Sequence, residues 1–253
     1  MLIFLPPSEG KSEPSGGPVE LASLAFDDSL GEARRELIKG LEELGRGSRQ
    51  EAVEALGISE GQAGDVDRDA ALSEAPTGPA IEVYSGVLFD RLDFGSLSAE
   101  AHKRAATGLL IASALWGAVR PFDEIPWYRL SMKAKLPGLP GLAAFWRPRL
   151  TEAMERAGFD DESEVILDMR SAAYAAAWKP SRAELVAVRA FREEGGKRKA
   201  VSHMAKATRG EVARLVLSPG KEPTSPEDVA TLIEGAGLTV ELGDGTLDVI
   251  ESA

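Results

Sequence analysis

The 253-residue chain lacks cysteine and has only two histidines, His102 and His203. Without cysteine the protein cannot contain a disulfide, a thiolate zinc site, a cysteine-bound iron–sulfur cluster or a peroxidatic cysteine. Because the histidines are far apart, there is also no HExxH motif and no two-histidine iron site within a short motif. The composition therefore predicts no metal or other cofactor, although carboxylates from distant segments could still bind Mg²⁺.

Long hydrophobic runs are also missing. No stretch reaches the roughly 18 apolar residues that a membrane-spanning helix needs, so we expect no membrane association. The segment Met1–Pro7 has neither the basic start nor the long apolar core of a signal peptide. These features predict a cytoplasmic protein and leave its oligomeric state open.

Basic residues are outnumbered, with 29 Lys and Arg against 41 Asp and Glu, a net charge of −12. This total argues against nucleic-acid binding, which depends on neutralising phosphate. The charge is uneven, however. Residues 101–150 hold eight basic and two acidic residues (+6), and residues 181–214 hold nine and four (+5). These blocks are either solvated helix faces or the two sides of an electropositive cleft that binds an anion.

Uniform apolar runs bounded by helix-breaking residues predict buried strands. They occur at Leu2–Leu5, Leu109–Leu115, Val165–Met169 and Ala200–Met204. Two further strands at Thr239–Leu242 and Leu247–Ile250 flank a Gly-Asp-Gly turn and predict a hairpin.

Helices are predicted between these strands from apolar periodicity and capping residues. They are expected at residues 29–44, in a short helix capped by Ser48 and ended by Gly57, at 145–157 with entry near Pro148, at 205–217 and at 226–235. Residues 61–79 are expected to form a long loop, or a weak helix followed by one. The alternation of strands and helices predicts a single α/β domain over residues 1–253, with a central mixed sheet flanked by helices.

The first candidate motif, Ser8-Glu9-Gly10-Lys11, directly follows the first strand. It has the Gly-Lys-Ser character of a phosphate loop, but Leu5 stands where the Walker A pattern requires glycine, and Pro14 follows where a helix should begin. One interpretation makes Lys11 an anion ligand, with Glu9 and Ser8 on the wall of a cleft. The other is an ordinary polar exit from a strand.

A second motif follows the strand at residues 109–115 and contains Arg120, Asp123, Trp127, Tyr128 and Arg129. Arginine suits bidentate contact with phosphate or carboxylate, and an aromatic ring could stack on a base. The alternative is a structural pair between Arg120 and Asp123, with the aromatic residues in the core.

Two more candidates lie near the ends of later predicted strands. Tyr174 follows the strand at residues 165–169. Lys206 and Arg209 are three residues apart in a predicted helix and therefore share a face. His203, at the expected strand end before that helix, could act as an acid or base, or could be structural.

Taken together and in this order, these segments resemble the YaaA family of peroxide-stress proteins. The matching pieces are residues 2–11, 83–86, 115–123, 126–132, 145–146, 166–174 and 204–210. The resemblance implies a cytoplasmic α/β protein of unusual fold with a positively charged cleft. It also implies protection against hydrogen peroxide through lower free iron, and DNA binding through the cleft and a helix-hairpin-helix element.

The chain departs from the family pattern in three places. The lysine after the first strand is displaced by two positions to Lys11, Ala207 stands where many members have a second lysine, and Ala173 replaces an acid before Tyr174. These departures change the cation set that the resemblance implies.

Two functions therefore remain in competition. In the first, the protein binds double-stranded DNA and limits iron-dependent oxidative damage. Its phosphate contacts would be Lys11, Arg120, Arg129, Lys133, Lys206 and Arg209. In the second, it is an enzyme acting on a small phosphate-bearing ligand such as a nucleotide or nucleoside. Arg and Lys would clamp the phosphate, and the acid–base group would come from Glu9, Asp123, Tyr174 or His203. Direct iron sequestration is the weakest hypothesis, because the chain offers neither cysteine nor clustered histidine.

Overall fold

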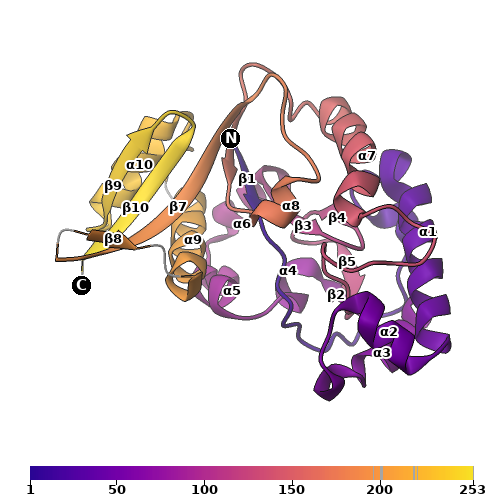
Figure 1. Cartoon of the computed structure of the whole chain (residues 1–253). Coiled ribbons are helices and arrows are strands. Elements are labelled where there is room, and N and C mark those ends of the chain that lie inside the picture. The colour runs from indigo at the N-terminus through magenta and orange to yellow at the C-terminus, as the bar shows by residue number, and fades with distance from the viewer. Residues whose placement is uncertain (196, 200–201, 219, 221, 253) are drawn as a thin grey trace.

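The computed structural model describes residues 1–195, 197–199, 202–218, 220 and 222–252, and it has an α/β architecture (Figure 1). The large sheet has the spatial order β4 (Gly117–Val119), β3 (Leu109–Ser113), β1 (Leu2–Leu5), β6 (Val165–Asp168), β7 (Glu184–Glu194), β10 (Thr246–Ser252) and β9 (Thr239–Gly243). Strand β8 (Lys197–Lys199) pairs with β7 outside this path.

Parallel pairing joins β3, β1, β6, β7 and β10, whereas β4, β8 and β9 run antiparallel to their neighbours. A separate two-stranded sheet consists of β2 (Thr77–Pro79) and β5 (Glu124–Pro126). The prediction of an α/β fold with a central mixed sheet flanked by helices is thereby confirmed. All four residues of β1 are buried, as its uniformly apolar sequence predicts.

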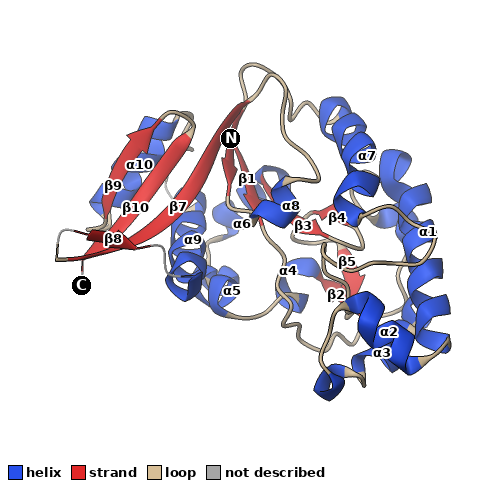
Figure 2. Ribbon diagram, viewed as in Figure 1, coloured by secondary structure: helices blue, strands red, loops and turns tan. Residues whose placement is uncertain are grey.

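Helices flank this sheet, with α1 (Asp27–Arg46) and α7 (Leu142–Arg156) at one end of the molecule and α10 (Pro226–Gly235) at the other (Figures 1 and 2). Helices α1 and α7 pack together, and α10 packs on β9. Helix α9 (Ser202–Leu217) packs on β7 and against α5 (Val87–Leu92) and α6 (Ala99–Gly108). The shorter helices are α2 (Arg49–Leu56), α3 (Asp65–Asp69), α4 (Ala80–Val83) and α8 (Ala172–Ala175), with 3₁₀ turns η1 (Leu21–Ser23), η2 (Glu60–Gln62), η3 (Leu72–Glu74) and η4 (Phe94–Ser96).

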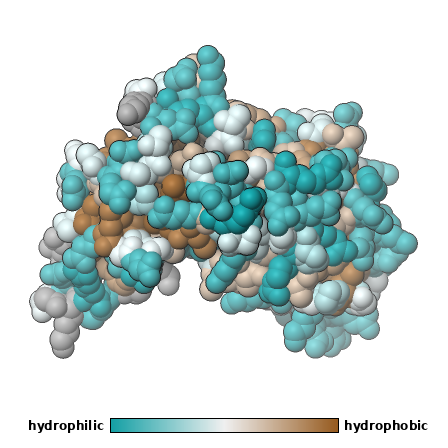
Figure 3. Space-filling model, turned by 90° about the horizontal axis from the view of Figure 1, so that it is seen from above, coloured by the Kyte–Doolittle hydropathy of each residue, from teal (hydrophilic) through white to brown (hydrophobic). Residues whose placement is uncertain are grey.

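Three tryptophans, Trp116, Trp146 and Trp178, are completely buried in the core beneath these helices. Seen from above, most of the surface is hydrophilic, and hydrophobic residues gather at the end that holds β7, β9 and β10 (Figure 3). In the part of the chain that the structure describes, no helix combines the length and hydropathy needed to cross a bilayer.

Several elements were predicted correctly from their capping residues and turns. The Ser48 hydroxyl accepts a hydrogen bond from the Glu51 amide at the start of α2, and Gly57 ends this helix with a positive φ of 65°. Ser225 caps α10 in the same way, and β9 and β10 form the predicted hairpin.

Three local predictions were wrong. Helix α7 begins at Leu142, so Pro148 lies inside it; the Arg149 guanidinium donates to the Phe145 carbonyl at 2.6 Å, near the place where proline lacks an N–H. Residues 61–79 do not form one long loop; they contain η2 in part, α3, η3 and β2, so the alternative of a weak helix is right for α3 but the loop expected after it is replaced by η3 and β2. The strand expected at 200–204 is helical from Ser202 onward, because a short apolar run alone does not distinguish a strand from a buried helix turn.

Substituting Gly210 by alanine is expected to destabilise the fold. A Cβ atom at this position of α9 would overlap the Leu88 carbonyl oxygen of α5, so the two helices would have to move apart. Forcing a methyl group into such a contact typically costs about 1–3 kcal/mol. Urea unfolding followed by circular dichroism would measure the loss.

Gly40→Ala is the matched control, because a Cβ atom at this position in α1 meets nothing within 4 Å. The higher helix propensity of alanine should stabilise that variant by up to about 1 kcal/mol. A Gly210→Ala protein as stable as the unmodified one would contradict the close contact between α5 and α9.

Candidate functional site

The candidate site lies at the carboxyl edge of the central strands. Strand β1 pairs with β3 on one side and with β6 on the other, so the loops that follow these strands diverge at this point. In open α/β sheets such a divergence is where ligands bind. A narrow cavity of about 60 Å³ is lined here by parts of four segments: residues 7–11 after β1, residues 56–62 after α2, residues 128–131 after β5, and Tyr174 in α8.

Lys11 lies at the centre of this site, and both its backbone and its side chain are held in place. The loop after β1 is tied to residues 83–85 by hydrogen bonds from the Ser12 amide to the Val83 carbonyl (2.8 Å) and from the Ser85 amide to the Gly10 carbonyl (3.1 Å). The Lys11 Nζ atom donates to the Ser8 carbonyl at 3.0 Å. These contacts aim the amine inward, toward the cavity.

The surroundings of this amine disfavour its charged form. Burial is the main cause and the nearby Arg129 charge adds to it, and together they lower the pKa of Lys11 to about 7. The Nζ atom lies 4.3 Å from the centroid of the Tyr128 ring and 5.5 Å from that of Tyr84, and such ring faces attract a cation. Desolvation outweighs this attraction, so the amine is partly neutral at physiological pH.

Behind the amine, Ser113, Tyr128 and Tyr84 form a buried chain of hydroxyl groups. The Tyr128 oxygen lies 2.7 Å from both the Ser113 Oγ and the Tyr84 hydroxyl. Ser113 Oγ already accepts hydrogen bonds from the Leu115 and Trp116 amides, so its proton points to Tyr128, and the Tyr128 proton points to Tyr84. Burial raises the pKa of Tyr84 to about 12, so this chain remains protonated and holds the rings beneath Lys11 rigidly.

Arg129 forms one side of the cavity and is held by two other segments, helix α3 and the loop after β1. Its Nε donates to Asp65 Oδ2 at 2.8 Å, its Nη1 donates to the Glu9 carbonyl at 3.1 Å, and its backbone amide donates to Asp69 Oδ1 at 2.9 Å. The guanidinium has five N–H donors in total, so three remain for a ligand. This arrangement suits an anion bound at the cavity.

Asp69 is the carboxylate that most influences the charge of the site. Its side chain is fully buried, and its Oδ2 atom has no hydrogen-bond partner among the described residues. Burial raises the pKa of Asp69 to about 7, although the Arg129 amide and the Lys11 charge oppose the rise. Lys11 and Asp69 therefore titrate in the same pH range and influence one another.

Glu9 and Tyr174 complete the wall of the cavity. Glu9 is exposed at its edge, whereas Tyr174 is half-buried. Burial raises the pKa of Tyr174 well above the ordinary tyrosine value, so its hydroxyl stays protonated and can donate a hydrogen bond. The structure thus brings together Glu9, Lys11, Arg129 and Tyr174, four of the residues selected from the sequence.

Arg120 and Asp123 instead stabilise the loop that carries them. Asp123 Oδ2 accepts hydrogen bonds from the Arg120 amide at 2.9 Å and from the Ala25 amide at 3.1 Å, which ties this loop to the segment before α1. Burial raises the pKa of Asp123. The pairing runs through the backbone of Arg120, and the Arg120 guanidinium lies 5.8 Å from the Phe26 ring. Tyr128, considered above as a stacking partner for a base, is buried and cannot present its face to one.

The remaining predicted cations lie outside the lining of the cavity, as far as the described residues define it. Lys133 and Lys206 are exposed. Arg209 is half-buried in α9, donates to the Val188 carbonyl at 3.3 Å and interacts electrostatically with Asp168. His203 belongs to α9 rather than to a strand end, and its side chain lies outside the part of the structure that is described.

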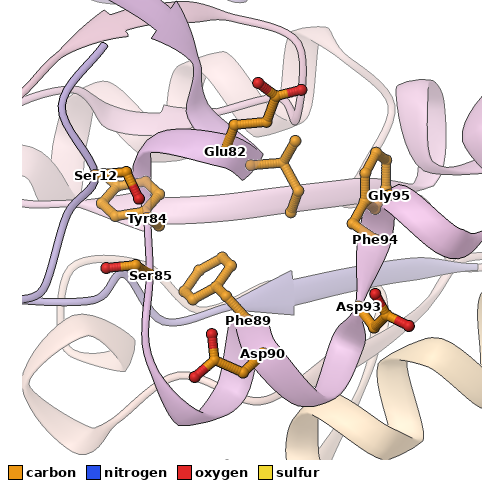
Figure 4. Close-up of a pocket in the computed structure, with 10 residues that line it drawn as sticks. Ser12, Glu82, Tyr84, Ser85, Phe89, Asp90, Asp93, Phe94 and Gly95 are labelled. Atoms are coloured by element: carbon orange, nitrogen blue, oxygen red, sulfur yellow. The ribbon is translucent and has the colours of Figure 1, made fainter.

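A second, wider hollow of about 470 Å³ is lined in part by Tyr84 (Figure 4). The Phe89 and Phe94 rings and the carboxylates of Glu82, Asp90 and Asp93 line it. Within the described ranges, no group of three or more His, Asp or Glu side chains is arranged to hold a metal ion.

Sequence reasoning missed Asp65, Asp69 and the role of Tyr84. The two aspartates lie in the stretch expected to be a loop, and only their i,i+4 spacing indicated that both could face the same partner. Tyr84 belongs to one of the family-like segments, but no sequence pattern indicated that it lies beneath Lys11.

The proton equilibrium of Lys11 should be directly measurable. In the intact protein, NMR titration of the lysine Cε signals should show Lys11 titrating near pH 7, far below the ordinary lysine range near 10.4. Asp69→Asn removes a negative charge that stabilises the ammonium, so it should lower the pKa of Lys11 further. Asp67→Asn is the matched control, because Asp67 lies in the same helix and pairs with Arg49 at the surface. A Lys11 signal that titrates near pH 10 would contradict this description.

Comparison with known proteins assigns the sequence to a family. Residues 1–241 match a family model described as peroxide stress protein YaaA. The chain is 44% identical over 245 residues to UPF0246 protein SCO2297 of Streptomyces coelicolor, covering 95% of this chain and 92% of that protein. It is 40% identical over 255 residues to UPF0246 protein CE1889 of Corynebacterium efficiens, covering 99% and 98%. The family resemblance of the sequence motifs is confirmed, and the chain belongs to the YaaA family of peroxide stress proteins.

Proposed function

We propose that this protein is an enzyme that acts on a small anionic substrate, of the nucleotide or nucleoside class, bound at the Lys11 cavity. The observation that carries the proposal is a lysine amine held at a narrow cavity, next to an arginine with N–H donors left for a ligand, where burial lowers the pKa of the lysine to about 7. A site that only grips phosphate requires fully charged cations, which burial disfavours. An amine with a pKa near 7 is instead suited to transferring protons at physiological pH.

Each residue of the site has a defined role in this proposal. Neutral Lys11 removes a proton from the substrate or attacks it, and the ammonium form returns a proton. Arg129 binds the anionic group through its remaining N–H donors. Tyr174 donates a hydrogen bond to a substrate oxygen, and Glu9 at the edge of the cavity is a second carboxylate for proton transfer.

Turnover should depend on the Lys11 amine. A panel of nucleoside mono-, di- and triphosphates and of nucleosides, followed by NMR and chromatography, should contain at least one compound that the protein converts. Lys11→Met should lower that rate by roughly 10²-fold or more, the usual contribution of a general acid or base. When the neutral amine is the base, the rate should rise with pH through about 7, because the pKa of Lys11 is about 7.

Lys103→Met is the matched control, since Lys103 is an exposed lysine of α6 that pairs with Glu100. It should leave the rate unchanged. If no compound of the panel is bound or converted, or if Lys11→Met retains full turnover, the enzyme proposal is wrong.

DNA binding is the second candidate, and the exposure of Lys133 and Lys206 favours it, because phosphate contacts require accessible cations. Arg129 and Arg209 are less suited to this role, since both are half-buried and duplex phosphates require accessible cations.

Fluorescence anisotropy with a labelled DNA duplex over a range of salt concentrations tests this second candidate. If Lys133 and Lys206 contact phosphate, binding should weaken steeply with salt, and Lys133→Ala and Lys206→Ala should each reduce the salt slope by about one. Lys103→Ala should not change the slope. Absence of binding at low salt would exclude DNA as the ligand.

A further inference from the structure

We propose that the Lys11 amine is a nucleophile that forms a covalent imine with a small carbonyl compound carrying an anionic group. This inference rests on the proposed enzymatic function and deepens it, because it names the reacting group of the substrate and the bond that forms. The geometry that carries it is a fixed amine facing a narrow cavity of about 60 Å³, which admits the reacting carbonyl group of a substrate but not a whole nucleotide.

The contacts of Lys11 differ from those of a structural or phosphate-binding lysine. Among the described residues no carboxylate forms an ion pair with its amine, and its one hydrogen bond is donated to the Ser8 carbonyl. Its other close neighbours are the Tyr84 and Tyr128 rings. An amine whose purpose is to remain charged would be expected to have a counter-ion beside it, whereas a nucleophile needs its lone pair free.

Imine formation requires only the Lys11 amine and the carbonyl compound. The lone pair of the Lys11 nitrogen attacks the carbonyl carbon, a C–N bond forms, and the C=O π electrons move to the oxygen, which takes up a proton. The carbinolamine then loses this oxygen as water, and the nitrogen loses its protons to give the imine. The overall reaction is amine plus carbonyl to imine plus water, so no oxidant or reductant is needed.

Tyr174 is placed to assist at the oxygen. Tyr174 lines the cavity and its hydroxyl remains protonated, so it can hydrogen-bond to the carbonyl oxygen and to the alkoxide that develops there. Arg129, on the adjacent wall, suits a carboxylate or phosphate attached to the carbonyl carbon or its neighbour. Leu56 and Ile58 supply apolar surface that helps exclude water from the reacting centre.

Reductive trapping tests this inference directly. The full-length protein is incubated with glyoxylate and sodium cyanoborohydride at pH 7, and modified lysines are located by peptide mass spectrometry. Lys11 should carry a carboxymethyl group and should be modified at least about tenfold faster than the exposed Lys103, since far more of its amine is neutral. Lys11→Arg should abolish the adduct in that peptide, and Tyr174→Phe should slow its formation.

Modification of exposed lysines with none at Lys11 overturns the inference, and so does equal modification of Lys11 and Lys103. To separate this from a failure of the proposed function, the same protein is tested for turnover of the nucleotide panel. If Lys11→Met abolishes turnover while Lys11 is never trapped, the lysine acts only in proton transfer and the imine is wrong. If Lys11 is trapped but no nucleotide or nucleoside is converted, the proposed substrate class is wrong, whereas the inference that Lys11 forms an imine still holds.

Discussion

The arrangement of the site depends on the transfer of one amine from water into the interior beside the central sheet. Pro6 and Pro7 end β1 because neither can donate a backbone hydrogen bond, and the chain then turns to pair Gly10–Ser12 with residues 83–85. This pairing forces the Lys11 side chain over the Tyr84 and Tyr128 rings. An ammonium in such surroundings loses most of its hydration, which favours the neutral amine, and the negative charge of Asp69 compensates for this loss only in part.

The segment between α2 and β2 supplies that compensation. Helix α3 has only five residues, but it presents Asp65 to the Arg129 guanidinium and Asp69 to the Arg129 backbone amide. A helix this short is not stable by itself, so its position depends on packing against α1 and α2. Its acidic residues thus tie a surface segment to the edge of the sheet, and they fix Arg129 beside the cavity.

Sequence patterns located those parts of the site that follow a strand. Lys11, Glu9 and Tyr174 come directly after β1 and β6, whose apolar runs are recognisable, and the carboxyl ends of parallel strands meet at one edge. Asp69 was not predictable in this way, because its role depends on where α3 packs. Arg120 and Asp123 come after the parallel strand β3, but the antiparallel strand β4 lies between β3 and their loop. The loop therefore leads away from the site, toward Ala25. His203, which was expected at the end of a strand, lies in α9 instead, because the chain is already helical from Ser202.

The Lys11–Asp69 pair explains how the site can hold a neutral amine without a change in its total charge. With pKa values of both groups near 7, a proton lost by the ammonium can be taken up by the carboxylate, so the charged pair and the neutral pair have the same net charge. Arg129, fixed beside Lys11 in the wall of the cavity, keeps a positive charge in either state and continues to attract an anion. An anionic substrate is therefore drawn to the cavity while the amine that meets it has its lone pair available, a combination that two fully charged cations could not provide.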